Sequence, residues 1–120
     1  MEDGIPLFLQ IAQQIENSII DGTLGEEEQA PSTTELAAFH RINPATAAKG
    51  VNQLVADGIL HKRRGIGMFV SPGAQARLRE RRRGQFAAQF IAPLLAEAEK
   101  LGLDPDEVIA MIAAARGGVR

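Results

Sequence analysis

The segment from Pro31 to Val70 constrains the fold of this 120-residue chain most, because two helix starts and a glycine-containing hairpin follow one another in it. Ser32-Thr33-Thr34-Glu35 has the spacing of a capping box, in which each of the two end side chains binds the backbone amide of the other residue. Asn43-Pro44 combines an N-cap residue with proline at the first helical position. The segment therefore predicts two short helices, the second ending near Asp57.

The residues after Asp57 predict a β-hairpin. Residues 59–62 and 68–70 suit two short strands, and the basic turn Arg63-Arg64-Gly65-Ile66-Gly67 separates them. Glycine in such a turn adopts positive φ angles without steric cost and lets another backbone approach closely. We therefore expect an antiparallel pair of strands with a basic tip.

Apolar residues recur with helical spacing at the start of the chain and after the capping box. The first set follows Pro6 and predicts a core helix that ends near Gly22. It consists of Leu7, Phe8, Ile11, Ala12, Ile15 and Ile19. In the helix after the capping box, Leu36, Ala37 and Phe39 are expected to form the buried side.

The helix that begins at Pro44 has two different faces when it is projected at about 100° per residue. The face expected to pack consists of Ala47, Ala48, Val51, Leu54 and Val55. The other face is small or polar and consists of Ala45, Thr46, Lys49, Asn52, Gln53 and Ala56. Such a surface suits the major groove of DNA, where bulky apolar groups would clash and short donors reach base edges. By itself it also suits an ordinary surface helix.

The residues from Pro72 onward predict two short apolar helices. One should span Phe86 to Leu101 and bend at Pro93, and the other should be capped by residues 104–107 and end at Gly117-Gly118. Burial of a large apolar side chain contributes about 1.5–3 kcal/mol, and two short helices cannot bury so many alone. We expect a homodimer with a two-fold axis, formed by Phe86, Phe90, Ile91, Leu94, Leu95, Leu101, Val108, Ile109 and Ile112. The alternative is that the tail folds back onto its own N-terminal part.

Charge is distributed unevenly along the chain, although the net charge is only -2. Residues 1–30 have seven acidic side chains and no lysine or arginine, whereas residues 61–83 have eight basic side chains and one acidic side chain. The positive charge thus gathers on the predicted hairpin and just after it, where phosphates could bind. The arginines that follow the hairpin could equally well form only a solvated helix face. They are Arg77, Arg79, Arg81, Arg82 and Arg83.

Together these elements predict a mainly α protein with a small β-hairpin. The order helix, helix, helix, hairpin is that of a winged helix-turn-helix, which grips duplex DNA with a recognition helix and a wing. We expect this DNA-binding domain over residues 1–71 and a two-helix dimerisation module over residues 72–120.

Several other classes of function are disfavoured. The chain has no cysteine, and His40 and His61 stand apart without an acidic cluster at ligand spacing, so we expect no metal, no cofactor and no catalytic residue. The acidic residues 104–107 are explained by their place at a helix start. The longest apolar runs are too short to cross a bilayer. We expect a cytoplasmic protein that is not an enzyme and does not bind membranes.

Six short motifs lie between residues 6 and 70. They are Pro6-Leu7-Phe8-Leu9-Gln10-Ile11, Ala30-Pro31-Ser32, Glu35-Leu36-Ala37, Ile42-Asn43-Pro44-Ala45-Thr46, Asp57-Gly58-Ile59-Leu60 and Arg64-Gly65-Ile66-Gly67-Met68-Phe69-Val70. This set resembles the GntR family of bacterial transcriptional regulators. The helix start at residues 43–50 and the short tail resemble its YtrA-like subgroup. The resemblance implies a repressor with a small helical dimerisation module, acting on operons that include transporter genes and often on its own operon.

The resemblance also implies a set of DNA contacts. Thr33 or Thr34 should meet phosphate, residues of the next helix start should read the major groove, and the turn of the hairpin should form the wing contact. The family often has arginine at the positions of Thr34 and Ala48, so we move the expected phosphate contact to Lys49. The predicted DNA-binding residues are Ser32, Thr33, Thr34, Asn43, Ala45, Thr46, Lys49, Arg63, Arg64, Gly65 and Gly67.

A homodimer would present two recognition helices to an inverted-repeat operator in double-stranded DNA. We also allow for a small-molecule effector of unknown identity. The alternative from another class is a winged-helix module that binds a protein partner through its basic wing, without sequence-selective DNA binding.

Overall fold

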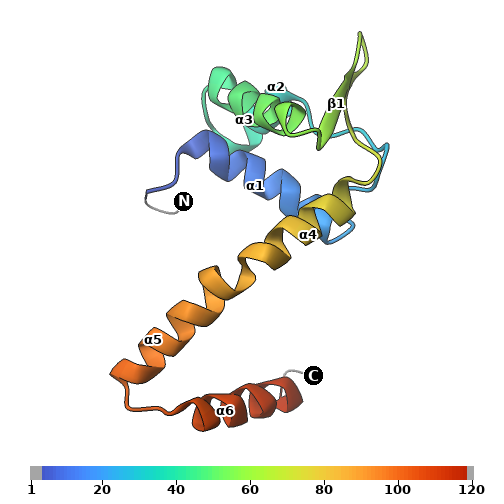
Figure 1. Ribbon diagram of the computed structural model, residues 1–120. Helices are drawn as coiled ribbons and strands as arrows, with labels where there is room; N and C mark the ends of the chain where they lie inside the picture. The colour runs from blue at the N-terminus through green and yellow to red at the C-terminus, as the bar shows by residue number, and fades with distance from the viewer. Residues whose placement is uncertain (1–3, 119–120) are drawn as a thin grey trace. The chain divides into compact units, whose positions relative to one another are not determined.

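The computed structural model describes residues 4–118, with the helices and strands in the order shown in Figure 1. Three helices come first and are followed by two strands: α1 (Leu7–Ile20), α2 (Thr33–His40), α3 (Pro44–Ala56), β1 (Leu60–Arg63) and β2 (Gly67–Val70). The rest of the chain is helical: α4 (Ala74–Phe86), the π-helical turn η1 (Ala87–Ile91), α5 (Ala92–Lys100) and α6 (Pro105–Gly118). The predicted fold class, mainly α with a small β-hairpin, is confirmed.

The chain divides into two compact units, Met1–Glu80 and Arg81–Arg120. The sequence suggested domains of residues 1–71 and 72–120, of which residues 1–3 and 119–120 lie outside the described part. The first unit extends beyond residue 71 because the start of α4 packs into its core, where Ala74 and Leu78 are completely buried.

The core of the first unit forms where α3 packs against α1 and α2. Gly50 makes this packing close, because a Cβ atom at Gly50 would lie 2.6 Å from the carbonyl oxygen of Phe8 in α1. The large side chains that are fully buried here are Ile11, Ile19, Val51, Leu54, Ile59, Leu60, Val70 and Leu78.

Both predicted helix starts are present. The hydroxyl oxygen of Ser32 accepts a hydrogen bond from the Glu35 amide at 3.0 Å, and a Glu35 carboxylate oxygen accepts one from the Ser32 amide at 2.9 Å. Asn43 begins α3, and its side-chain oxygen accepts the Ala45 amide at 2.8 Å. These bonds satisfy amides that a helix start leaves without partners inside the helix.

The prediction that Phe39 is buried was wrong. Leu36 and Ala37 are buried, but the Phe39 side chain is 82% exposed. At about 100° per residue, Phe39 lies about 60° from Leu36 but about 160° from Ala37, so it stands at the edge of the buried side of α2. Its ring meets the His40 ring edge-on, and it lines a surface groove of about 640 Å³ together with Leu24.

The hairpin has a third partner that the sequence did not indicate. β1 and β2 are antiparallel, with Leu60 opposite Val70. The preceding loop pairs along the other edge of β2: the Glu27 amide donates to Val70 at 2.8 Å, and the Ala30 amide donates to Met68 at 2.8 Å. The loop before α2 is therefore part of the wing.

The start of α4 holds the carboxyl ends of two earlier helices. The Arg77 guanidinium donates to the carbonyl oxygens of Asp57 and Gly58, at 2.9 Å and 3.1 Å, just after α3. Gln75 and Arg79 donate to the carbonyl oxygen of Ile20, the last residue of α1. The interpretation of this arginine cluster as only a solvated face was therefore wrong for Arg77 and Arg79.

The predicted cap of the last helix is present in the second unit, together with a turn at the end of α5. The Asp104 and Glu107 side chains each accept the other residue's amide, at 2.9 Å and 3.2 Å, at the start of α6. At the end of α5, Gly102 has a φ of 73° and the Leu103 amide donates to Ala98, as in a Schellman motif. The π-helical turn η1 lies just before Pro93, where proline cannot continue the regular helical bonding.

Most apolar side chains of the second unit remain uncovered. Ala98 and Val108 are buried. Between α5 and α6 runs a groove of about 360 Å³ that Leu94, Leu103 and Ile112 help to line. The exposed apolar side chains are Phe86, Phe90, Ile91, Leu94, Leu95, Leu101, Ile109, Met111 and Ile112. Of the residues predicted to form a dimer interface, Val108 alone is already covered within its own unit.

Candidate nucleic-acid interface

The start of α2 offers a place for a phosphate group. Helix starts carry partial positive charge and unpaired amides. Thr34 is exposed and Thr33 is half-buried, while Ser32 is engaged in the capping box. The Ser32 amide, and to a lesser degree the Ser32 side chain, lower the pKa of Glu35. Glu35 is therefore ionised at neutral pH and holds the helix start in place.

The exposed side of α3 is small and polar along its first turns. Asn43, Ala45 and Lys49 are exposed and Thr46 is half-buried, whereas Ala47, on the predicted packing face, is completely buried. The Asn43 side-chain oxygen caps the helix, which leaves its amide nitrogen as the donor that can face a ligand. The predicted division of this helix into a packed face and an open face is present in the structure.

Lys49 is tethered near the amino-terminal end of α1. Its ammonium nitrogen lies 4.2 Å from the centre of the Phe8 ring, which is within the range of a cation–π contact. The side chain is nevertheless exposed. The contact therefore places a positive charge beside the open face of α3.

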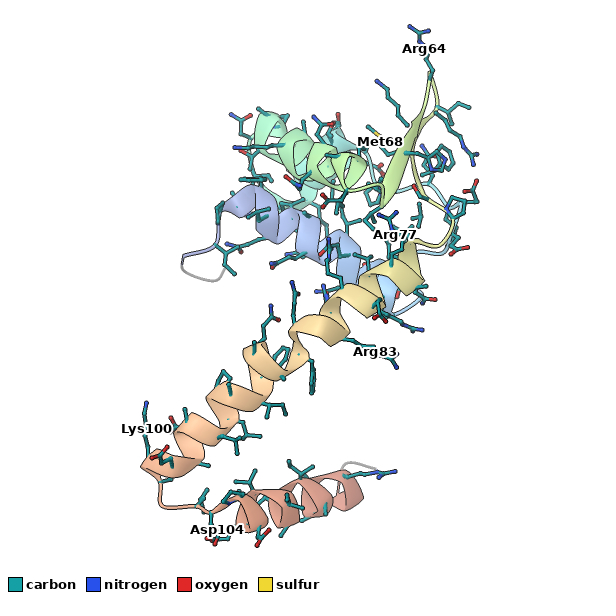
Figure 2. All side chains as sticks on the ribbon, viewed as in Figure 1. Arg64, Met68, Arg77, Arg83, Lys100 and Asp104 are labelled. Atoms are coloured by element: carbon teal, nitrogen blue, oxygen red, sulfur yellow. The ribbon has the colours of Figure 1, made fainter. Side chains whose placement is uncertain are left out.

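The wing presents its two arginines differently. Figure 2 shows Arg64 at the far end of the hairpin, pointing away from the helices. Arg63 is instead paired with a Glu27 carboxylate oxygen at 2.5 Å, and its guanidinium lies 4.1 Å from the centre of the Phe69 ring. Nothing in the sequence pointed to Glu27 as a partner, because it is 36 residues away and lies within an acidic run.

The two glycines of the wing have different roles. Gly65 has a φ of 75° and occupies the third position of the turn that the Ile66 amide closes with the Arg63 carbonyl oxygen, as a type II turn requires. At Gly67 a Cβ atom would lie 2.5 Å from the Gln29 side-chain nitrogen, which donates to the Ile66 carbonyl oxygen at 3.0 Å. Gly67 thus permits the loop before α2 to brace the hairpin.

The predicted DNA-binding residues all belong to the first unit, on the start of α2, on α3 and on the hairpin. The histidines have other neighbours: the Nδ1 atom of His61 lies 3.2 Å from the hydroxyl oxygen of Ser71. Residues 4–118 contain no group of three His, Asp or Glu side chains placed to hold a metal ion. None of the described helices is both long and apolar enough to span a bilayer.

Known proteins share this sequence pattern and this fold. The profile of the bacterial regulatory proteins, gntR family, matches residues 7–70. The HTH-type transcriptional repressor YtrA of Bacillus subtilis is 28% identical over 103 residues, which cover 86% of this chain and 78% of YtrA. The HTH-type transcriptional repressor NagR of the same bacterium is 34% identical over 70 residues, covering 58% of this chain and 29% of NagR.

Solved structures agree with these relatives. A putative transcriptional regulator of the GntR family from Bacteroides thetaiotaomicron has a TM-score of 0.74 and 27% identity, with 95% of this chain and 99% of that chain covered. AraR(DBD) in complex with operator ORX1 has a TM-score of 0.54 and 27% identity, covering 56% of this chain and 81% of that chain.

Proposed function

Because the chain belongs to the GntR family of bacterial regulatory proteins and is a DNA-binding transcriptional regulator rather than an enzyme, we propose that it is a homodimeric repressor of an inverted-repeat operator. Its own operon, including transporter genes, is the first place to look for that operator. We also infer that the protein acts in the cytoplasm, together with the DNA.

The open face of α3 beside the wing is the observation that carries the DNA-binding part of the proposal. Asn43, Ala45 and Thr46 are the proposed readers of base edges, because they are short and lie at the start of the helix. Phosphate contacts are assigned to Lys49 and to the start of α2 at Thr33 and Thr34. The similarity to AraR(DBD), whose structure holds an operator, supports DNA binding by this part of the chain.

The wing completes the proposed interface. Arg64 extends from the tip with Gly65 beside it, and a positive charge there suits the phosphate backbone next to the groove that α3 enters. Phosphate contacts position the protein without reading sequence. Affinity at the wing should therefore depend on salt more than on sequence.

The exposed apolar faces of α5 and α6 support the homodimer. Residues Phe90, Leu95 and Ile109 are each at least 45% exposed within their own chain. Exposed apolar side chains in such numbers indicate an interaction site. A second copy would cover it with the same residues through a two-fold axis, and that symmetry predicts an inverted repeat in the DNA.

Fluorescence anisotropy tests the proposal with the full chain, the duplex upstream of its own gene and a scrambled duplex. We expect saturable binding to the native duplex at physiological salt and release of the scrambled one. Equal, salt-sensitive binding to both would contradict autoregulation. A Thr46→Ala variant that bound the native duplex as tightly as wild type would contradict the proposed readout by α3.

A further inference from the structure

The ion pair between Glu27 and Arg63 is a feature of the wing that the proposed DNA contacts do not explain. The pair measures 2.5 Å, and the two side chains are 49% and 40% exposed, respectively. The Arg63 guanidinium also lies over the ring of Phe69, a residue that is 8% exposed. Arg63 is therefore held from two directions although it remains at the surface.

The backbone at Glu27 is arranged for this contact at a steric cost. Glu27 has a φ of 64°, in the left-handed region that residues with a Cβ atom seldom adopt. Its amide donates to the Val70 carbonyl oxygen at 2.8 Å, and the Glu28 carbonyl oxygen accepts the Val70 amide at 3.0 Å. These bonds to β2 fix the position from which the carboxylate reaches Arg63.

Arg64, the next residue along the chain, has no such contact with Glu27 and serves as a comparison for the access of Arg63 to a phosphate group. It is exposed at the tip of the hairpin (Figure 2), whereas Arg63 contacts Phe69 and Glu27. Two neighbouring arginines of equal charge thus have unequal access to a phosphate group. A carboxylate already in contact with Arg63 competes with any phosphate for it.

We propose that Glu27 is a specificity-determining residue, which keeps Arg63 on Phe69 and off the DNA backbone. The inference rests on the proposed contact between the wing and DNA. Phosphate contacts strengthen binding to every sequence, so an arginine withheld from the backbone lowers sequence-independent affinity and leaves base readout by α3 unchanged. The wing then grips DNA through its tip, and discrimination between operator and other DNA is preserved.

The test is a salt titration of the full chain on the scrambled duplex, followed by fluorescence anisotropy. Glu27→Gln should release Arg63 to a phosphate and steepen the slope of log affinity against log salt by about 0.9. Between about 50 and 200 mM salt, its affinity should fall about 3.5-fold more than that of wild type. Arg63→Gln alone should leave the slope unchanged. The double variant, which combines Glu27→Gln with Arg63→Gln, should have the wild-type slope again.

Glu28→Gln is the matched control. It makes the same change of charge one residue away, and its remaining side-chain oxygen can still accept the Gly25 amide as Glu28 does. It should bind like wild type. If Glu27→Gln fails to fold by circular dichroism, Glu27→Asn replaces it, because asparagine tolerates a positive φ better than most residues.

Three results would overturn the inference. One is a slope about 0.9 shallower for Arg63→Gln, which would show that Arg63 contacts a phosphate in the wild-type complex. Another is a slope that stays steeper than wild type in the double variant, which would show that Glu27 acts by its charge alone. The third is a wild-type slope for Glu27→Gln. If wild type bound neither duplex, the proposed function itself would fail, and the inference with it.

Discussion

The two units of this chain differ in how far their large apolar side chains are buried. In the first unit, Ile11, Leu54 and Leu78 are at most 1% exposed, and the polar side of α3 faces outward. In the second unit, Ala98 and Val108 are buried, while Phe90 and Ile109 remain at least 60% exposed. The first unit is complete as one copy, and we infer that the second unit is completed by another copy.

This difference separates two requirements of a regulator of this kind. Reading DNA needs a rigid surface of polar side chains, which a closed core supplies. Recognising a two-fold operator needs two such surfaces at a fixed spacing, which an open apolar module can supply by pairing. Three pairs of substitutions test this division, from the largest expected effect to the smaller ones, and a fourth prediction concerns the first unit alone.

The largest effect is expected from a charge added to the open apolar face of the second unit, where two copies should pair. Ile109→Glu should prevent pairing and lower affinity for a two-half-site operator by about 100-fold or more, because the two half-sites would no longer be bound as one unit. Anisotropy on that operator measures the loss. Ala110→Glu, on the opposite side of α6 from Val108, adds the same charge and should have little effect.

If Ile109→Glu bound the operator like Ala110→Glu, the open face of α6 would not be the site of pairing. Binding to a duplex with a single half-site provides an internal check. We expect both variants to bind it equally, since the first unit is unchanged.

Glycine to alanine substitutions should have opposite signs in the two units. Gly50→Ala places a Cβ atom 2.6 Å from the Phe8 carbonyl oxygen, so we expect a loss of about 1–3 kcal/mol in unfolding free energy from overpacking. Gly84→Ala, on the part of α4 in the second unit, meets nothing within 4 Å and should gain about 0.5–1 kcal/mol from reduced backbone freedom. Urea denaturation measures both, and equal effects would contradict the difference in packing.

The arginines of α4 should also differ by unit. Arg77→Ala removes the bonds to the Asp57 and Gly58 carbonyl oxygens, and we expect it to cost about 0.5–1.5 kcal/mol of stability. Arg83→Ala removes the same side chain from the second unit, where it is exposed, and should change stability by less than about 0.5 kcal/mol. Chemical denaturation at constant pH compares them. A larger loss from Arg83→Ala would reverse the expected order.

The smallest effect is a dependence on acid pH at the start of α2. The pKa of Glu35 is lowered in the folded chain by the Ser32 amide and then by the Ser32 side chain. The stabilisation is therefore fully present above the unfolded pKa of about 4.3 and is lost as pH falls through the folded pKa. Glu35→Gln should lower Tm at neutral pH, and its difference from wild type should shrink under acid conditions. A difference that is independent of pH would contradict this role of the carboxylate.

Local signals explain what could be predicted from the sequence. The capping box at Ser32, the proline after Asn43 and the glycine-containing turn at Gly65 act within a few residues, and each lies where the sequence suggested. The two faces of α3 followed from helical spacing. The prediction that Phe39 is buried was wrong, because α2 has only eight residues. Its two buried side chains, Leu36 and Ala37, are too few to define where the buried side ends.

Long-range contacts were out of reach of the same reasoning. Arg77 binds carbonyl oxygens 19 and 20 residues away, and Glu27 meets Arg63 across 36 residues. Nothing in the sequence distinguishes Gly50 from other positions of α3, although α1 approaches it closely. Such contacts depend on tertiary packing, and a charged residue in a basic or acidic run gives no indication of which partner it will meet.

The most direct test of the division between the units is the mass of the full chain in solution, measured by analytical ultracentrifugation at micromolar concentration with and without a two-half-site operator. We predict a dimer without DNA and two copies on each duplex. A monomer without DNA that binds the duplex as one copy would contradict the claim that a second copy completes the second unit.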